Sequence, residues 1–197
     1  MSGCSTLAAP AHVVLEVRKS KFVANATAIA TQEDAAVFIA RVSDATATHN
    51  CWAWRLGQRY RFSDDGEPGG TAGKPILAAI DGQRMDRVAV VVTRWFGGIK
   101  LGVGGLARAY GGCAAECLRT SARVAIVDTA TVECRVDYAT VPRLRARFTL
   151  LDAAVEHEMP EAAGVLLRLH LPVARLDALS RLLADLTRGR GELRRID

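Results

Sequence analysis

Glycine is concentrated in two short segments of this 197-residue chain, and this distribution constrains the fold more than any other feature. Of the 17 glycines, four lie between Gly66 and Gly73 and seven between Gly97 and Gly112. Because glycine loses more backbone entropy on folding than other residues, such clusters indicate positive φ angles or a backbone in close approach to another group. Each segment follows an expected strand, so we expect the two segments to meet in one cleft.

The second segment predicts an anion site at the start of a helix. Residues 104–119 have the apolar spacing of a helix. The free N–H groups and the positive dipole end at the N-terminus of this helix suit a phosphate. We assign to an anion or nucleic-acid site Lys74, Arg94, Trp95, Gly97, Gly98, Lys100, Gly102, Gly104, Gly105 and Arg108. Arg94, Lys100 and Arg108 are expected to converge on one phosphate, with Trp95 as an exposed ring. The alternative is that the glycines only allow tight packing.

Acidic residues lie in the first segment and directly before it. Asp64, Asp65 and Glu67 could hold Mg²⁺ beside a phosphate, as a phosphoryl-transfer site would require. Three acids around a Gly/Pro turn are also typical turn formers and helix caps, which is the reading we prefer. The expected cofactor is therefore none, with Mg²⁺ as the alternative. His49 and Cys51 resemble half of a nucleophilic pair, but no orienting acid is identifiable, so we expect no catalytic residue.

Three longer motifs carry a family resemblance that spans roughly residues 13–120. The runs THNCWAWRLG, RFSDDGEPGGTAGKPIL and VVVTRWFGGIKLGVGGLARAYGGC resemble the YigZ/IMPACT family, in its bacterial, stand-alone form. The resemblance implies a first domain similar to ribosomal protein S-five domain two. It also implies a second, ferredoxin-like domain of the kind found in translational GTPases. As part of the first run, His49 is expected to line the same cleft.

The remaining elements predict two α+β domains. Residues 12–18, 21–30, 50–56 and 87–93 read as strands, and residues 57–75 as mostly loop. After residue 131 the pattern is strand, helix (141–150), strand, strand, helix, strand, which is a ferredoxin-like βαββαβ order. We therefore expect a flexible tail at 1–12, a first domain at 13–129 and a second at 130–197.

Composition excludes some classes of protein and leaves others open. The net charge of +5 and the pI of about 9.2 are compatible with nucleic acid without being diagnostic. The five cysteines form no C-x-x-C pair, and their odd number argues against a disulfide framework. The apolar runs are too short to span a bilayer, and the first ten residues do not read as a signal peptide. We expect a cytoplasmic protein with no membrane partner.

These observations favour a binding protein over an enzyme. The basic first domain and the glycine/arginine segments favour RNA or a ribosome-associated assembly as the partner. The resemblance implies a link to translational control under stress, which eukaryotic members exert by competing for an activator of an initiation-factor kinase. One alternative is a Mg²⁺-dependent enzyme that acts on a phosphorylated metabolite or nucleotide. Another is a protein-interaction module that binds an acidic segment of a partner.

Overall fold

The computed structural model describes residues 4–196 of the chain. The structure divides into two compact units, Met1–Ile126 and Val127–Asp197. Both units combine helices with antiparallel sheets, so the expected α+β class with two parts is found.

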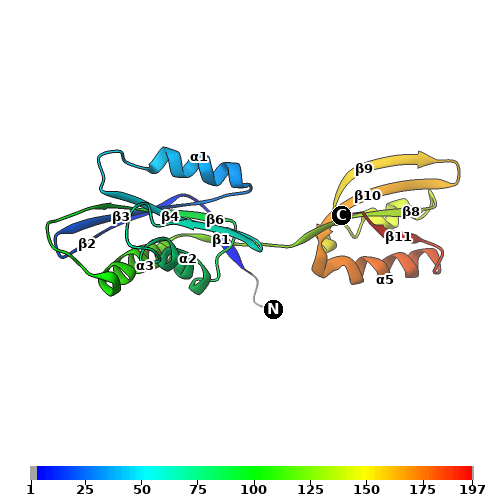
Figure 1. The fold of residues 1–197 in the computed structure, drawn as a ribbon. Helices are drawn as coiled ribbons and strands as arrows, with labels where there is room; N and C mark the ends of the chain where they lie inside the picture. Colours follow the sequence, from blue (N-terminus) through cyan, green and yellow to red (C-terminus); the bar gives the residue numbers. More distant parts are fainter. Residues whose placement is uncertain (1–3, 197) are drawn as a thin grey trace. The chain divides into compact units, whose positions relative to one another are not determined.

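The first unit is built on a five-stranded antiparallel sheet (Figure 1). Its strands, in spatial order, are β2 (Ala11–Val17), β3 (Ser20–Ala28), β6 (Val88–Trp95), β4 (His49–Leu56) and β5 (Arg59–Ser63). In this register Arg94 lies opposite His49 on β4, and Trp95 lies opposite Lys21 on β3. A separate two-stranded ribbon pairs β1 (Ser5–Leu7) with β7 (Arg123–Ala125).

Helices cover both faces of this sheet (Figure 1). Helix α1 (Gln32–Val42) packs on one face, while α2 (Gly73–Gly82) and α3 (Val103–Thr120) pack on the other. The central strand β6 therefore contributes to two cores: Val90 faces α2 and α3, whereas Val91 faces α1. The strand expected at residues 87–93 is confirmed, and its continuous Val/Ala run is buried on both faces.

One expectation for the first unit is wrong, and another is incomplete. A flexible tail over residues 1–12 is not found in its described part, because Ser5–Leu7 pairs with β7 and Ala11 begins β2; residues 1–3 lie outside the described residues. The stretch 57–75 is mostly loop, as expected, but it also contains a strand that was not expected from the sequence. Gly57, at φ 62°, closes a two-residue hairpin after β4, and β5 follows it with the alternating sequence RYRFS.

The second unit is a four-stranded antiparallel sheet with helices on one face (Figure 1). Along the chain its elements are β8 (Thr129–Val136), α4 (Val141–Arg145), η1 (Thr149–Leu151), β9 (Ala154–Glu161), β10 (Gly164–Pro172), η2 (Val173–Arg175), α5 (Leu176–Thr187) and β11 (Glu192–Arg195). The spatial order is β11-β8-β10-β9, and the expected sequence of strands and helices is found.

One helix of the second unit is shorter than expected. The helix expected at 141–150 ends at Arg145, after which the chain tightens into i→i+3 hydrogen bonds, such as those from Phe148 N to Arg145 O and from Leu150 N to Arg147 O. These bonds carry the chain into the 3₁₀ turn η1.

Among the helices that the structure describes, none combines the length and the apolar character needed to cross a membrane.

Candidate functional site

Both glycine-rich segments border one pocket of about 430 Å³ in the first unit. It is lined by Thr48, His49, Glu67, Pro68, Arg94, Phe96, Lys100, Leu101, Gly102, Val103 and Leu106. Glu67 and Pro68 come from the first segment, and residues 100–103 come from the second. The expectation that the two segments meet in one cleft is confirmed.

A buried ion pair joins the first segment to the end of β6 at this pocket. Arg94 Nη1 donates to Glu67 Oε1 at 2.6 Å, and the side chains are only 6% and 4% exposed. Tyr110 on α3 donates to the same oxygen at 2.7 Å; burial raises the pKa of its phenol, which keeps the donor protonated. The Arg94 guanidinium also lies 5.5 Å from the Phe22 ring centroid and 5.4 Å from that of Phe96.

This arrangement corrects the role expected for Arg94. Its positive charge is neutralised inside the fold by Glu67, so it is not a free cation for a phosphate. Its Nε is fully buried, and no hydrogen bond from the described part of the chain reaches it. Arg94 and Lys100 line the same pocket, but Lys100 is exposed and Arg94 is not.

His49 stands at the pocket wall in a fixed orientation. Its Nδ1 donates to the carbonyl oxygen of Asp65 at 2.7 Å, and its Nε2 lies 3.9 Å from Glu67 Oε1. Cys51 lies on the same face of β4, but it is buried and its Sγ donates to the Asp64 carbonyl oxygen at 3.0 Å. Burial raises the pKa of the Cys51 thiol to about 12, which leaves it a poor nucleophile.

The three acids in and directly before the first segment have separate partners. Asp64 accepts the backbone N–H groups of Gly70, Ala72 and Gly73 at 2.8 to 2.9 Å. Partial burial acts to raise the pKa of this carboxyl, but the three donors lower it below its ordinary value. Asp65 accepts from the backbone N–H of Asn50.

With Glu67 held by Arg94, these acids do not share a metal site, and no such cluster is found among residues 4–196. The preferred reading as turn formers and caps describes Asp64 and Asp65. Because the three carboxylates have separate partners, they do not form the Mg²⁺ site that the alternative required.

The start of α3 differs from that of the other long helices of this unit. The N-cap of α1, Thr31, accepts from Asp34 N, and the first N–H groups of α2 are held by Asp64. By contrast, Gly102 caps α3 at φ 72° without a side-chain hydrogen bond, and no acid lies in the first turn. Gly102 and Val103 line the pocket, so the free N–H groups and the positive dipole end lie at its edge.

Two other cations assigned from the sequence lie outside the pocket. Arg108 lines a different hollow of about 320 Å³, together with Arg18, Leu101 and Gly105. Lys74 is exposed in the first turn of α2 and lines neither hollow. The expected convergence of Arg94, Lys100 and Arg108 on one phosphate is therefore wrong.

The aromatic residue at the pocket is Phe96 rather than Trp95. Consecutive residues of a strand point to opposite faces, so Trp95 leaves the face that carries Arg94 and lies beside Lys21, whose Nζ is 5.0 Å from the ring centroid. Phe96 lines the pocket and is 47% exposed. The alternation of side chains between the two faces of β6 was the sequence signal that could have identified Phe96 instead of Trp95.

The glycines of the second segment serve different purposes. A Cβ on Gly97 would overlap the Lys19 carbonyl oxygen in the β2–β3 turn, and Gly98 has φ 86°. These two glycines are required by the fold itself. At Gly104 a Cβ would meet only the Arg108 guanidinium, at 3.5 Å, and at Gly105 it would touch Leu101 at 3.0 Å.

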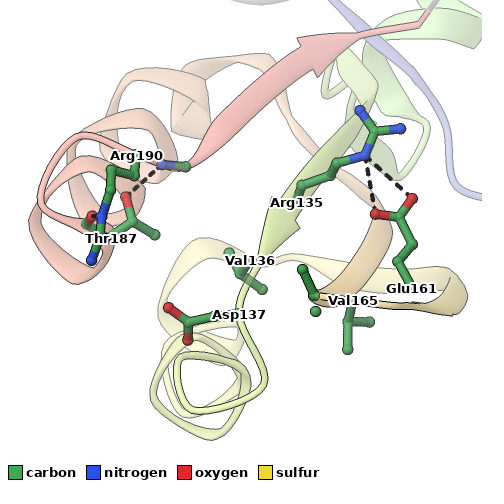
Figure 2. Close-up of a pocket in the computed structure, with 10 residues that line it drawn as sticks. Arg135, Val136, Asp137, Glu161, Val165, Thr187 and Arg190 are labelled. Carbon is green, nitrogen blue, oxygen red and sulfur yellow. Dashed lines mark hydrogen bonds and ion pairs between the residues drawn. The ribbon is translucent and has the colours of Figure 1, made fainter.

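A second pocket, of about 400 Å³, lies in the other unit (Figure 2). Several of its polar side chains already form hydrogen bonds or ion pairs within the protein. Figure 2 shows Arg135 directed at Glu161, with Arg190 beside Thr187; Arg135 Nε lies 3.3 Å from both Glu161 carboxylate oxygens. Asp137 accepts from Thr140 N at 2.8 Å. The first-unit pocket, with its uncapped helix, is therefore the stronger binding candidate.

Comparison with known proteins shows which proteins this chain resembles. Residues 18–118 match the Impact N-terminal domain. The chain is 46% identical over 178 residues to an IMPACT family member from Thermus thermophilus, covering 88% of this chain and 97% of the relative. It is 38% identical over 199 residues to the IMPACT family member YigZ of Escherichia coli, covering 96% of each.

Solved structures and a more distant relative extend the comparison. A crystal structure of a hypothetical protein matches at 36% identity with a TM-score of 0.71, covering 100% of this chain and 98% of the other. Protein IMPACT of Mus musculus is 33% identical over 93 residues, which are 43% of this chain and 29% of that protein. The chain therefore belongs to the IMPACT family, and its Impact N-terminal domain contains the pocket described above.

Proposed function

We propose that this protein is a cytoplasmic, non-enzymatic binding protein that holds single-stranded RNA through a nucleotide in the first-unit pocket. The observation that carries the proposal is the uncapped N-terminus of α3 at the edge of that pocket, beside Lys100. Unsatisfied N–H groups, the positive end of the helix dipole and an ammonium group together favour a phosphate.

The shape and lining of the pocket support a nucleotide rather than a bare anion. A volume of about 430 Å³ lies within the range of small-ligand sites. Phe96 presents a half-exposed ring, and Val103 at the helix start is 65% exposed. An accessible aromatic ring next to a cationic side chain suits stacking of an unpaired base with its phosphate held alongside.

Family membership supports a place in translation or its regulation, including under stress. We carry this link from the family as part of the proposal, with a ribosome-associated assembly as the setting for the RNA. The antiparallel order β11-β8-β10-β9 supports a ferredoxin-like fold for the second unit. We propose the ribosomal-protein-S-five-domain-two-like fold for the first unit. Fold kinship by itself assigns no function, so the proposal rests on the pocket.

Binding of labelled RNA oligonucleotides, measured by fluorescence anisotropy at several salt concentrations, tests this proposal. Lys100→Glu should weaken binding across many sequences and lower the salt slope by about 0.7, because one phosphate contact is lost. Arg59→Glu is the matched control, since Arg59 is exposed at the far end of the β4–β5 hairpin from His49. Equal effects of the two substitutions, or no binding by the unaltered protein, would remove the proposal.

The same experiment separates the enzyme alternative. Saturable binding of a small phosphorylated compound that requires Mg²⁺, with no response to polynucleotide, would replace RNA as the ligand. Binding of an acidic peptide alone, sensitive to Lys100→Glu, would indicate a protein-interaction module.

A further inference from the structure

One carboxylate oxygen at the floor of the pocket lacks a hydrogen-bond partner. Arg94 and Tyr110 both donate to Oε1 of Glu67, and no hydrogen bond from residues 4–196 reaches Oε2. Among those residues, Arg94 Nε is the only side-chain nitrogen or oxygen that is both fully buried and unpartnered. Oε2 is therefore not fully buried, and because Glu67 is among the residues that line the pocket, we infer that this oxygen faces the ligand space.

His49 provides a second acceptor beside Glu67. A backbone carbonyl can only accept, so the hydrogen bond between His49 Nδ1 and Asp65 O places the proton on Nδ1. In the neutral ring, Nε2 then carries the lone pair. At 3.9 Å from Glu67 Oε1 it forms no hydrogen bond with that residue, and His49 lines the pocket.

The neighbouring wall of the pocket is largely apolar. Pro68, Phe96, Leu101, Val103 and Leu106 line the same pocket as Glu67 and His49, so a flat ring can be buried there beside these two acceptors. A buried acceptor left unpaired in a complex carries a free-energy cost, so these two acceptors select a ligand with two adjacent donors.

We propose that the pocket binds a guanine base, with Glu67 Oε2 and His49 Nε2 accepting from its N1–H and 2-amino groups. Guanine is the standard base that presents two neighbouring donors on its Watson–Crick edge. Adenine and cytosine place an amino donor next to a ring acceptor, and uracil places its one N–H between two carbonyl oxygens. This inference rests on the proposed nucleotide function and names the base of that same site.

Titration calorimetry with four mononucleotides tests the base preference directly. Guanosine 5′-monophosphate should bind about ten-fold or more tighter than inosine 5′-monophosphate, which lacks only the 2-amino donor. Adenosine and uridine 5′-monophosphates should bind at least as weakly as the inosine compound. Equal affinities for all four would overturn the guanine assignment.

Glu67→Gln converts the open acceptor into a donor and should change the preference. Arg94 and Tyr110 still require an acceptor at the position of Oε1, so the amide oxygen should stay there and the amide NH₂ should face the pocket. The variant should then favour adenosine over guanosine monophosphate, because an acceptor beside a donor matches adenine. A retained guanosine preference in a folded Glu67→Gln protein would contradict the proposal.

His49→Phe keeps the inference testable if Glu67→Gln does not fold. It removes the acceptor and keeps a ring, so guanosine monophosphate affinity should fall about ten-fold and the preference over adenosine monophosphate should disappear. His12→Phe, at an exposed position of β2, is the matched control and should leave both affinities unchanged. An unchanged preference in folded His49→Phe would overturn the assignment.

Failure of this inference and failure of the proposed function are distinguishable. RNA binding that depends on Lys100 but shows no preference for guanine would leave the proposed function standing and remove the guanine site. If guanosine monophosphate binds with the expected variant pattern but RNA does not bind, the guanine site stands and the proposed RNA-binding function is removed. Absence of both would remove both.

Discussion

Glu67 and Arg94 lie 27 positions apart in the sequence and form a buried ion pair with 2.6 Å between Oε1 and Nη1. The pair joins the first glycine-rich segment to the end of β6, directly before the second segment. The Tyr110 hydroxyl donates to the same carboxylate, so α3 is tied to the pair as well. One carboxylate thus connects the three parts of the chain that surround the pocket.

Removing the carboxylate of this pair should destabilise the protein strongly. In Glu67→Ala, the Arg94 guanidinium would remain buried without its counter-charge, so we expect the free energy of unfolding to fall by about 3 to 5 kcal/mol. Urea denaturation measures this change. Glu67→Ala combined with Arg94→Met should cost less than Glu67→Ala alone, because no unpaired charge remains. A loss below about 0.5 kcal/mol in the single variant would show that the pair is not buried in solution.

Gly97 and Gly104 should respond differently to the same substitution. A Cβ at Gly97 would overlap the Lys19 carbonyl oxygen, so Gly97→Ala must shift the β2–β3 turn or the second segment. We expect a loss of about 2 kcal/mol or more. Gly104→Ala adds a Cβ that meets only a flexible guanidinium, so its unfolding free energy should stay within about 1 kcal/mol of the unaltered protein. Thermal unfolding of the two variants compares them, and similar midpoints would contradict the close approach at Gly97.

Asp64 should make the stability of the first unit depend on pH. Partial burial opposes ionisation, but three backbone donors lower the pKa of its carboxyl below the ordinary value of 3.8. A lowered folded-state pKa contributes stability that is fully present above the unfolded-state pKa and is lost as the pH falls through the folded-state pKa.

The comparison of the unaltered protein with Asp64→Asn isolates this contribution. The difference in unfolding free energy should be constant above about pH 5 and should shrink below about pH 4. Urea unfolding at a series of pH values measures it. A difference that grows towards low pH would mean that the Asp64 pKa is raised, not lowered.

The first unit should fold when expressed alone as residues 1–126. It has its own core and its own pocket, and its described backbone is paired up to the hydrogen bond from Ile126 N to Cys4 O. Residues 1–118, the end of the family match, are the informative comparison, because this cut removes β7 and leaves β1 without its partner. We expect the shorter fragment to unfold at a lower denaturant concentration. Failure of residues 1–126 to unfold cooperatively would show that the division into two units is wrong.

Patterns confined to a few neighbouring residues were readable from the sequence. The strands expected at 12–18, 21–30 and 87–93 correspond to β2, β3 and β6, and the glycine clusters marked the pocket. The β5 strand was missed although RYRFS alternates, because it is only five residues long and lies in a stretch rich in glycine and proline. The helix expected at 141–150 was too long, since periodicity does not show where α-type hydrogen bonds give way to 3₁₀ bonds.

The roles of individual charged and aromatic residues were decided by tertiary structure. Arg94 and Lys100 are both cations near the same glycines, but only Arg94 is brought into the interior opposite Glu67, where desolvation makes a counter-charge necessary. Trp95 and Phe96 are adjacent, and the side of the sheet that α3 covers determines which ring reaches the pocket. Local sequence determines backbone periodicity and turns because these depend on interactions within a few residues. The partners and the exposure of a side chain depend on which distant side chains share the same buried space. The packing of the sheet against its helices determines this.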